Sequence, residues 1–389
     1  MKLTGPVGRY LIGPKSNEWA VGVCPDWKWG IPVQFSRNLE DETMKNRKCS
    51  ALIRILSVGV VFALALGFSV LPAAEAAKST ARLAVFPLGL MRMCSTWMED
   101  TGVWKKYGAK HGVEFKIMYP RDDFAAFAGK SADAAAFAAF EIARIRSEEG
   151  WKVKMFGKDQ AGLIETYVRA DSPYKSIRDL KGKNFGIPGW ATAAALQYQV
   201  LIKHFYNLDL KKDFKIVVSS FPLVPKLLER GSIESGSSIE PLTMGGVMTG
   251  KFRVLDNMTY AEQWEKRTGH YGLAVTLWAA REAYLAKNPT VPRAILEAWT
   301  EALEYANNNT GKFVRQYKKF VTRGGGTEAQ FDFFAKWIKD HRPMFKDAYL
   351  TKKYIEGENE FVRVAAKLGL IGKTKESEIQ AMWKLIPKP

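Results

Sequence analysis

The stretch that decides the predicted fold is residues 174–205, which read YKSIRDLKGKNFGIPGWATAAALQYQVLIKHF. A polar connector comes first, and residues 184–187 follow it as a short strand. A loop with proline and glycine then leads to residues 193–205, which have the apolar pattern of a helix. Strand, loop and helix in this order form the repeating unit of mostly parallel sheets. The stretch therefore predicts an α/β fold.

The same unit recurs on both sides of this stretch, because short apolar segments alternate with helical patterns along the chain. A helical pattern is expected from about Ser95 to Ala109, and from Arg281 onward the pattern is helical to the end. The expected strands are residues 83–86, 113–119, 132–137, 153–156, 184–187, 214–218, 235–239 and 274–279.

This repetition predicts two similar lobes. In each, a helix ends in glycine shortly before a strand that carries an acid, at residues 129–133 and 231–234. Two connections, near 165–169 and 274–279, would carry the chain across a hinge between the lobes. The lobes are expected to comprise residues 77–167 with 275–389, including the C-terminal helices, and residues 168–274.

Residues 44–76 have the three parts of a cleavable signal peptide. A positively charged start, MKNRK, precedes an almost wholly apolar run at 55–71, and Ala74 and Ala76 supply the small residues of a cleavage site. The run falls short of the about 20 apolar residues that a spanning helix needs, which favours cleavage over a membrane anchor. We expect a soluble periplasmic protein, with residues 1–43 an overextended start or a disordered segment.

The formal charge of +18 arises from 58 basic and 40 acidic residues. The basic residues are dispersed among acids and apolar residues and form no long basic arm, so nucleic acid is not an expected partner. Of the three cysteines, Cys24 and Cys49 precede the predicted cleavage point. Cys94 would then stand alone, which excludes an intrachain disulfide framework.

The sequence lacks the common signatures of catalysis. The four histidines are far apart in the sequence, and no pair has the spacing of a helical zinc site. The glycines at 324–326 lack the lysine and hydroxyl residue of a phosphate loop, and neither a nucleophile elbow nor a dinucleotide fingerprint is present. We expect no metal, no cofactor and no enzymatic activity.

Residues 171–183, DSPYKSIRDLKGK, resemble the segment that enters the second lobe of type II periplasmic solute-binding proteins, which serve sulfonate, taurine, nitrate and thiamine-precursor ABC importers. The sequence GIPG at 186–189, the 231–234 stretch and the triplet IEP at 239–241 follow in the family's order and spacing. The resemblance covers residues 83–286. The sequence departs from the family pattern at two places. Glu234 stands where the family often has an aspartate, and residues 235–238, SGSS, are more polar than the usual apolar strand.

The resemblance implies a bilobed fold with a two-crossing hinge that closes on a small solute. The protein is then expected to be the exported binding component of an ABC importer, a monomer that delivers an anionic or zwitterionic, sulfonate-like solute to a membrane permease. Two alternatives stay open. One is a pyrimidine-precursor enzyme on the same scaffold, and the other is an extracytoplasmic ligand-sensing subunit.

Ligands of open α/β sheets lie beyond the carboxyl ends of the strands, where helix N-termini point N–H groups at them. The loops at residues 87–96, 137–141, 188–192 and 240–243 meet this rule. The third is the strongest candidate, because glycine allows the backbone to approach a ligand and tryptophan offers a flat face. The predicted ligand-binding residues are Ser95, Thr96, Phe137, Gly189, Trp190, Ala191, Thr192 and Glu240.

Each prediction has a structural alternative. Ser95, Thr96 and Thr192 can cap helices, and the aromatic residues can belong to the core. Glu240, before a proline, can simply begin a helix, although it can also accept a hydrogen bond from an amine or ring N–H of a ligand such as a pyrimidine. The basic charge and the 189–190 loop favour a small anion instead, so the solute stays undecided.

Overall fold

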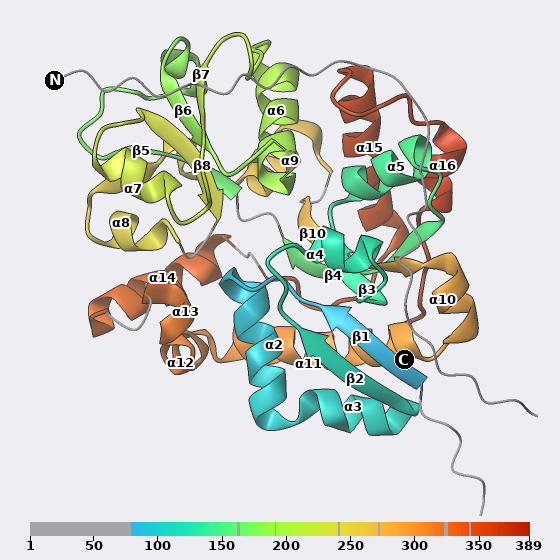
Figure 1. The fold of residues 1–389 in the computed structure, drawn as a ribbon. Coiled ribbons are helices and arrows are strands. Elements are labelled where there is room, and N and C mark those ends of the chain that lie inside the picture. Colours follow the sequence, from blue (N-terminus) through green and yellow to red (C-terminus); the bar gives the residue numbers. More distant parts are fainter. Residues whose placement is uncertain are drawn as a thin grey trace, which may run out of the picture. The chain divides into compact units, whose positions relative to one another are not determined.

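The fold is described for residues 79–389, apart from 162–163, 191, 240–241, 271–272, 323–325 and 342–343, in a computed structural model (Figure 1). The described residues belong to one compact unit. The predicted signal peptide at 44–76 and the segment 1–43 lie outside the described residues, as do Ala191 and Glu240 of the predicted site.

Sheet A has five strands, which are β1 (Ser79–Ala84), β2 (Val113–Met118), β3 (Ala134–Phe137), β4 (Val153–Ala161) and β10 (Ala274–Arg281). Their order in the sheet is β2-β1-β3-β10-β4. Strand β1 is parallel to both β2 and β3, and β10 runs antiparallel to β3 and β4. The carboxyl ends of β1, β2 and β3 therefore meet at one edge of the sheet.

Sheet B also has five strands, which are β5 (Ile164–Arg169), β6 (Asn184–Ile187), β7 (Lys215–Val218), β8 (Ser235–Ile239) and β9 (Phe252–Val254). Their order is β7-β6-β8-β5-β9. Strand β6 is parallel to β7 and β8, and β5 runs antiparallel to β8 and β9. Each strand of sheet B thus has a counterpart in sheet A.

In each sheet, one strand runs antiparallel to both of its neighbours, β10 in sheet A and β5 in sheet B. Each of these is the first strand that the chain forms after it crosses from the other sheet. The chain leaves β4 of sheet A and continues into β5 of sheet B, and it returns from sheet B through β10. Two crossings therefore join the sheets. The first joins β4, which ends at Ala161, to β5, which begins at Ile164 and pairs with β8.

An acid holds the start of the parallel strands together in both sheets. In sheet A, the backbone N–H of Arg82 donates to Asp133 Oδ2 at 2.9 Å, and the N–H of Asp133 donates to the carbonyl of Arg82 at 2.8 Å. In sheet B, the N–H of Asn184 donates to Glu234 Oε2 at 2.9 Å, and the N–H of Glu234 donates to the carbonyl of Asn184 at 3.0 Å. The two acids noticed in the sequence thus occupy the same position in their sheets.

Four helices accompany sheet A, and we call this part lobe 1. They are α2 (Gly89–Thr101), α3 (Val103–His111), α4 (Asp123–Ala128) and α5 (Ala139–Glu148). The sequence indicated one helix at 95–109, but the structure has two. They separate at Gly102, whose φ of 73° lies in the left-handed region that favours glycine.

Lobe 2 comprises sheet B with α6 (Ala193–Tyr206), α7 (Val224–Glu229), α8 (Met244–Met248) and α9 (Tyr260–Thr268). Two short 3-10 helices, η1 (Ile177–Leu180) and η2 (Leu255–Asn257), lie in its connections. The side chain of Thr192 begins α6, since its Oγ1 accepts a hydrogen bond from the N–H of Ala195 at 3.2 Å.

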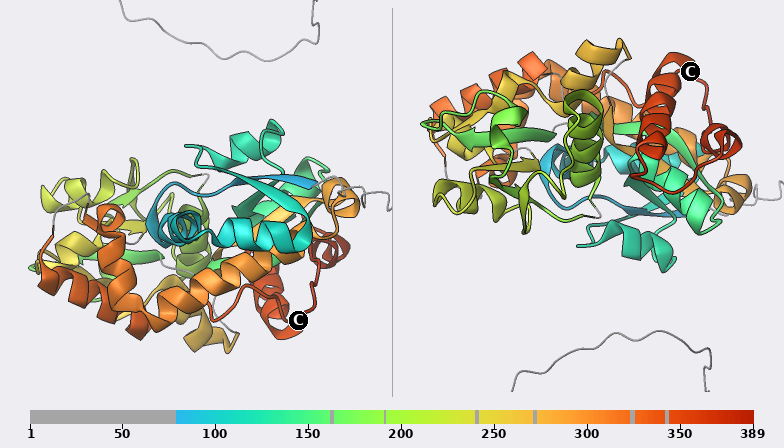
Figure 2. Two further views of the ribbon diagram at one scale, coloured as in Figure 1. Left: turned by 90° about the horizontal axis from the view of Figure 1, so that it is seen from below. Right: turned by 90° about the horizontal axis from the view of Figure 1, so that it is seen from above.

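The C-terminal part is helical, as expected from the sequence. Its helices are α10 (Glu282–Lys287), α11 (Val291–Asn308), α12 (Thr310–Gln316), α13 (Lys318–Thr322), α14 (Glu328–His341), α15 (Lys352–Lys367) and α16 (Glu376–Ala381). Helix α11 lies beside α2 and α3 of lobe 1 (Figures 1 and 2), and α15 and α16 pack on α5. Helix α14 contacts α8 of lobe 2. The C-terminal helices therefore pack on both lobes.

The core of lobe 1 is centred on aromatic residues of its inner strand and of α11. Trp278 of β10 and Trp299 of α11 are almost fully buried, and their rings lie 5.2 Å apart at 80°. The indole N–H of Trp299 donates to the carbonyl of Asp159 at 3.1 Å.

Within the described part of the chain, no helix has the length and apolar character that crossing a membrane requires.

Candidate ligand-binding cleft

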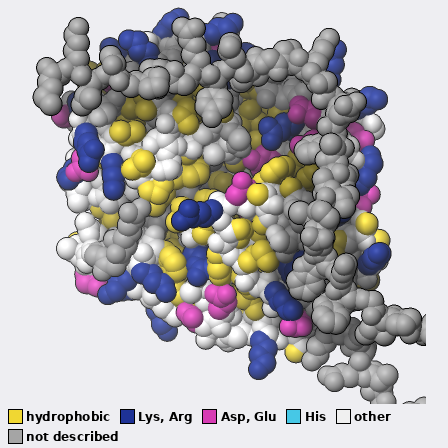
Figure 3. Space-filling model, in the orientation of Figure 1, with side chains coloured by type: hydrophobic (Ala, Val, Ile, Leu, Met, Phe, Trp, Pro, Cys, Tyr) yellow, Lys and Arg dark blue, Asp and Glu magenta, His cyan; other side chains and the backbone are white. Residues whose placement is uncertain are grey.

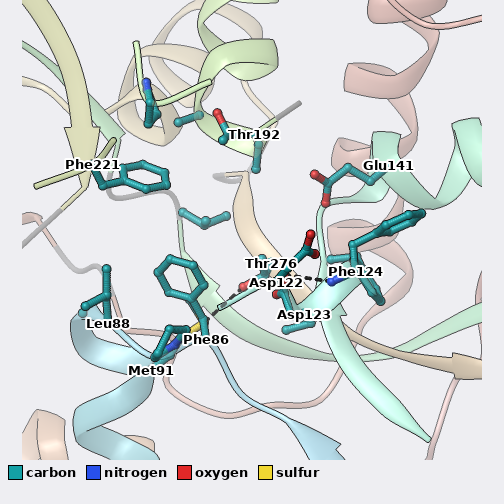
Figure 4. A pocket seen from close by; sticks show the side chains of 18 of the residues that line it. Phe86, Leu88, Met91, Asp122, Asp123, Phe124, Glu141, Thr192, Phe221 and Thr276 are labelled. Atoms are coloured by element: carbon teal, nitrogen blue, oxygen red, sulfur yellow. Dashed lines mark hydrogen bonds between the residues drawn. The ribbon is translucent and has the colours of Figure 1, made fainter. Parts of the chain in front are cut away.

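A cavity of about 1000 Å³ is lined by residues of both lobes (Figure 4). Lobe 1 contributes the loops that follow β1, β2 and β3, and lobe 2 contributes the loops that follow β6 and β7. These loops all leave the carboxyl ends of parallel strands, which is where open α/β sheets bind ligands. The cavity is therefore the candidate site, which we call the main cavity.

Phenylalanines form much of its wall. Phe86 from lobe 1 and Phe221 from lobe 2 face one another across the main cavity, with ring centroids 6.3 Å apart at 78° (Figure 4). Phe124 and Phe137 of lobe 1 meet in the same edge-to-face manner, at 6.3 Å and 82°. Edge-to-face geometry is the favoured arrangement of aromatic pairs. The wall thus offers an apolar seat to which both lobes contribute.

Three carboxyl groups of lobe 1 also line the main cavity, and each is held by a backbone N–H. Asp122 Oδ1 caps α4 through Ala125 at 2.8 Å, and Asp123 Oδ1 accepts from the N–H of Phe124 at 3.0 Å. Burial raises the pKa of Asp123.

Glu141 Oε2 accepts from the N–H of Ala138 at 2.8 Å. Burial raises its pKa to about 7, although that hydrogen bond and the charge of Arg144 oppose the rise. Glu141 therefore changes its charge near neutral pH.

The floor of the main cavity comes from β10 and from β4, the strand at the edge of sheet A. Gln160 is only 6% exposed, and its Oε1 has no hydrogen-bond partner among the described residues. Thr276 Oγ1 donates to Asp159 Oδ2 at 2.8 Å, behind the lining. Burial raises the pKa of Asp159 to about 8. A buried amide without a partner is costly, so Gln160 is well placed to bond a polar group of a ligand.

A smaller pocket of about 160 Å³ shares Glu141, Arg144 and Thr192 with the main cavity. We call it the side pocket. Trp190 and Lys211 of lobe 2 form one side of it, and residues 369–371 form another. The Nζ of Lys211 lies 5.1 Å from the centre of the Trp190 ring, and that tryptophan is 37% exposed.

The predicted site residues are distributed unevenly. Phe137 and Thr192 line the main cavity, whereas Trp190 lines the side pocket. The hydroxyl of Thr192 donates to the carbonyl of Gly189 at 2.8 Å in addition to capping α6. Gly189 has a φ of 144°, which side chains rarely adopt. The predicted glycine is thus required by the backbone of this loop.

Ser95 and Thr96 lie in the interior of α2 and are not among the lining residues of either pocket. The hydroxyl of Ser95 pairs with that of Tyr119 at 2.8 Å. Thr96 is 7% exposed, and its Oγ1 has no hydrogen-bond partner among the described residues. Because α2 already begins at Gly89, Ser95 and Thr96 are its seventh and eighth residues and do not lie at the helix start.

Two cavity loops were missed in the sequence, at residues 121–124 and 220–222. Both follow strands that the sequence did indicate, at 113–119 and 214–218. The strand-end rule that selected the other loops would have selected these as well.

Positive charge is dispersed on the face of the molecule that Figure 3 shows. In Figure 3, Lys and Arg side chains are spread over the visible surface, and hydrophobic side chains gather near its middle. The described residues contain no cluster of three or more His, Cys, Asp or Glu side chains arranged to hold a metal ion.

Comparisons with known proteins agree with this architecture. The family model NMT1/THI5 like matches residues 103–311. The alkanesulfonate-binding protein SsuA from Xanthomonas axonopodis pv. citri, solved bound to MOPS, has a TM-score of 0.61 and 12% identity, covering 79% of this chain and 99% of its own.

The periplasmic aliphatic sulphonate binding protein SsuA from Escherichia coli has a TM-score of 0.60 and 13% identity, over 80% of this chain and 94% of its own. The periplasmic nitrate-binding protein NrtA from Synechocystis PCC 6803 has a TM-score of 0.53 and 13% identity, over 79% and 86%. No curated protein matched by sequence. The structural likeness confirms the predicted bilobed type II fold.

Proposed function

Because the chain belongs to the NMT1/THI5-like family, we propose that it is the exported substrate-binding component of an ABC importer. It captures a small anionic or zwitterionic, sulfonate-like solute in the main cavity and delivers it to a membrane permease. Export uses the signal peptide at 44–76.

The observation that carries this proposal is the position of the main cavity. Loops from both sheets line it, and within the described residues two crossings join those sheets. Closure of two lobes about a hinge is a common way to enclose a ligand. A solute that contacts both Phe86 and Phe221 would favour the closed arrangement, and a permease can distinguish that arrangement from the open one.

The choice of solute class draws on the structural relatives. Two of them are described as sulfonate-binding proteins and one as a nitrate-binding protein. Small anions are therefore the first compounds to test. The buried amide of Gln160 and the three carboxyl groups also suit a solute with hydrogen-bond donors, which is why a zwitterion is included.

We assign no reaction to the cavity. The alternative pyrimidine-precursor enzyme would use a site rich in cysteine and histidine. Neither residue type is found among the described lining residues of the main cavity or the side pocket. The binding role needs only the cavity and the hinge.

A thermal-shift screen tests the proposal with taurine, alkanesulfonates, nitrate, bicarbonate and pyrimidines. A solute that binds only the folded state stabilises it by about 2.7 kcal/mol at a concentration of 100 Kd, so the melting temperature should rise with concentration. We expect this for at least one sulfonate. If no compound of any class raises the melting temperature, or if the protein chemically converts a bound pyrimidine, the proposal is contradicted.

Export is tested separately by N-terminal sequencing of the protein secreted by its host. The expected first residue is Ala77. A secreted chain that begins upstream of Met44 would contradict both the predicted signal peptide and the predicted start.

A further inference from the structure

The side pocket differs from the main cavity in its charges. Arg144 of α5 and Lys211 of lobe 2 both line it. Neither forms an ion pair with a carboxylate within the part of the chain that the structure describes. Arg146, on the same helix, provides the contrast, because its guanidinium pairs with both Glu282 and Glu378 at 2.8 Å. Arg144 and Lys211 are therefore left with their charge available to a ligand.

Other side chains of the side pocket fit an acidic ligand group. The ammonium of Lys211 lies over the ring of Trp190, and these two side chains form one wall of the side pocket. Gln199 adds a buried amide to the lining. Among the described lining residues, Glu141 is the one with a carboxyl group. Its pKa of about 7 allows it to bind a proton and so to accommodate a second anion nearby.

We propose that the side pocket is an anion subsite. It holds the sulfonate, phosphate or carboxylate group of a solute whose apolar body lies in the main cavity against Phe86 and Phe221, whose rings meet edge to face. This inference rests on the proposed function, since it describes the solute that the same cleft would capture.

The dimensions of the two pockets support a solute of two parts. The main cavity, at about 1000 Å³, is at the upper end of the roughly 300–1,000 Å³ typical of pockets for drug-sized ligands. Nitrate or taurine would leave most of it unfilled. The side pocket, at about 160 Å³, has room for one acidic group. Because Arg144 and Thr192 belong to both linings, one solute can reach both pockets.

Calorimetric titration of the full chain with three probes tests the inference. Naphthalene-2-sulfonate has an apolar body and an anion, 2-naphthalenemethanol has the body alone, and methanesulfonate has the anion alone. We expect naphthalene-2-sulfonate to bind at least tenfold more tightly than either of the others. Naphthalene-2-carboxylate and 2-naphthyl phosphate then show which acid the pocket prefers.

Two variants locate the anion. Arg144→Gln and Lys211→Gln should each weaken naphthalene-2-sulfonate at least tenfold and change the affinity for 2-naphthalenemethanol less than twofold, because a charge-assisted hydrogen bond to the acid is lost. Lys212→Gln is the matched control. It removes the same charge one residue away, at an exposed lysine that lines neither pocket, and it should have no effect.

The outcomes separate the two proposals. If a solute from the wider screen binds but neither variant affects naphthalene-2-sulfonate, or the sulfonate and the alcohol bind equally, the anion subsite is refuted and the binding function stands. If no compound in either set binds the wild-type chain, both proposals are refuted. Unchanged melting temperatures of the variants without ligand exclude misfolding as the cause of a loss.

Discussion

Lobe 1 lines the main cavity with charged side chains, whereas the described lining residues of lobe 2 are neutral. Arg121, Asp122, Asp123, Glu141 and Arg144 come from lobe 1. Lobe 2 contributes threonine, serine, alanine, proline and one phenylalanine. The two lobes share one strand order, so the difference does not arise from topology. We infer that the charged contacts of a solute in the main cavity come from lobe 1, and that lobe 2 adds its charge through Lys211 in the side pocket.

The equivalent strands of the two lobes are also built differently. Strand β3 reads AAAF and is fully buried, whereas β8 reads SGSSI. The buried hydroxyls of β8 are satisfied locally, because Ser235 donates to the carbonyl of Tyr167 at 2.9 Å and Tyr260 donates to Ser237 at 3.0 Å. A polar strand is thus accommodated at the same place in the sheet by neighbouring hydrogen bonds.

The largest expected effect concerns two apolar clusters of unequal size, the larger of which includes residues of both lobes. Trp278→Ala, in the aromatic core of lobe 1, should lower the free energy of unfolding by about 4 kcal/mol, because it leaves a large cavity. Leu228→Ala, in the small apolar cluster of lobe 2, should lower it by about 2 kcal/mol. Urea denaturation measures both. Equal decreases in the free energy of unfolding would contradict the expected difference between the two clusters.

The two acids beside the parallel strands, Asp133 and Glu234, should also differ in how strongly they stabilise the fold. Asp133 accepts from the backbone, Nε and Nη2 of Arg82, whereas Glu234 accepts from one backbone N–H. We expect Asp133→Ala to destabilise the fold by about 2 kcal/mol and Glu234→Ala by about 1 kcal/mol. Denaturation of the two variants in parallel makes the comparison, and the reverse order would contradict it.

Trp190 tests the contribution of lobe 2 to binding. Trp190→Ala should weaken the solute found in the screen at least tenfold, or about 1.4 kcal/mol, because it removes one wall of the side pocket. Trp151→Ala is a control, since Trp151 stacks on Phe124 from outside the lining. Unchanged calorimetry for Trp190→Ala would remove this residue from the site.

The smallest expected effect is a pH dependence that originates in lobe 1. Below its pKa of about 7, Glu141 is protonated, and repulsion of an anionic solute disappears. The affinity for an anion should therefore rise about threefold as the pH falls from about 8 to about 6. Glu141→Gln should abolish the change, whereas Thr192→Val should retain it. Affinity that rises with pH would indicate a cationic solute instead.

Much of the fold could be predicted because its signals are local. Strands β6 and β8 coincide with the segments expected at 184–187 and 235–239. Helix α9 was missed, although Thr259 and Glu262 form a capping box that the sequence displays, with Glu262 Oε2 accepting from the N–H of Thr259 at 2.7 Å. Attention to that motif would have found the helix.

The site was harder to predict because it depends on contacts between distant segments. Phe86 and Phe221 meet only when the two lobes are assembled. Glu141 looks in sequence like an ordinary acid in the first turn of a helix, and only its burial makes it titrate near neutral pH. Ser95 resembled a helix start because the beginning of α2 at Gly89 has no capping side chain to announce it.

The central claim is that a solute binds between the lobes, and calorimetry on a blocked cleft tests it most directly. Ala193 lines the main cavity at the first position of α6. We predict that the wild-type chain binds a sulfonate with one-to-one stoichiometry and that Ala193→Trp binds it at least tenfold more weakly at an unchanged melting temperature. Equal binding by the two proteins would place the solute elsewhere and contradict the account.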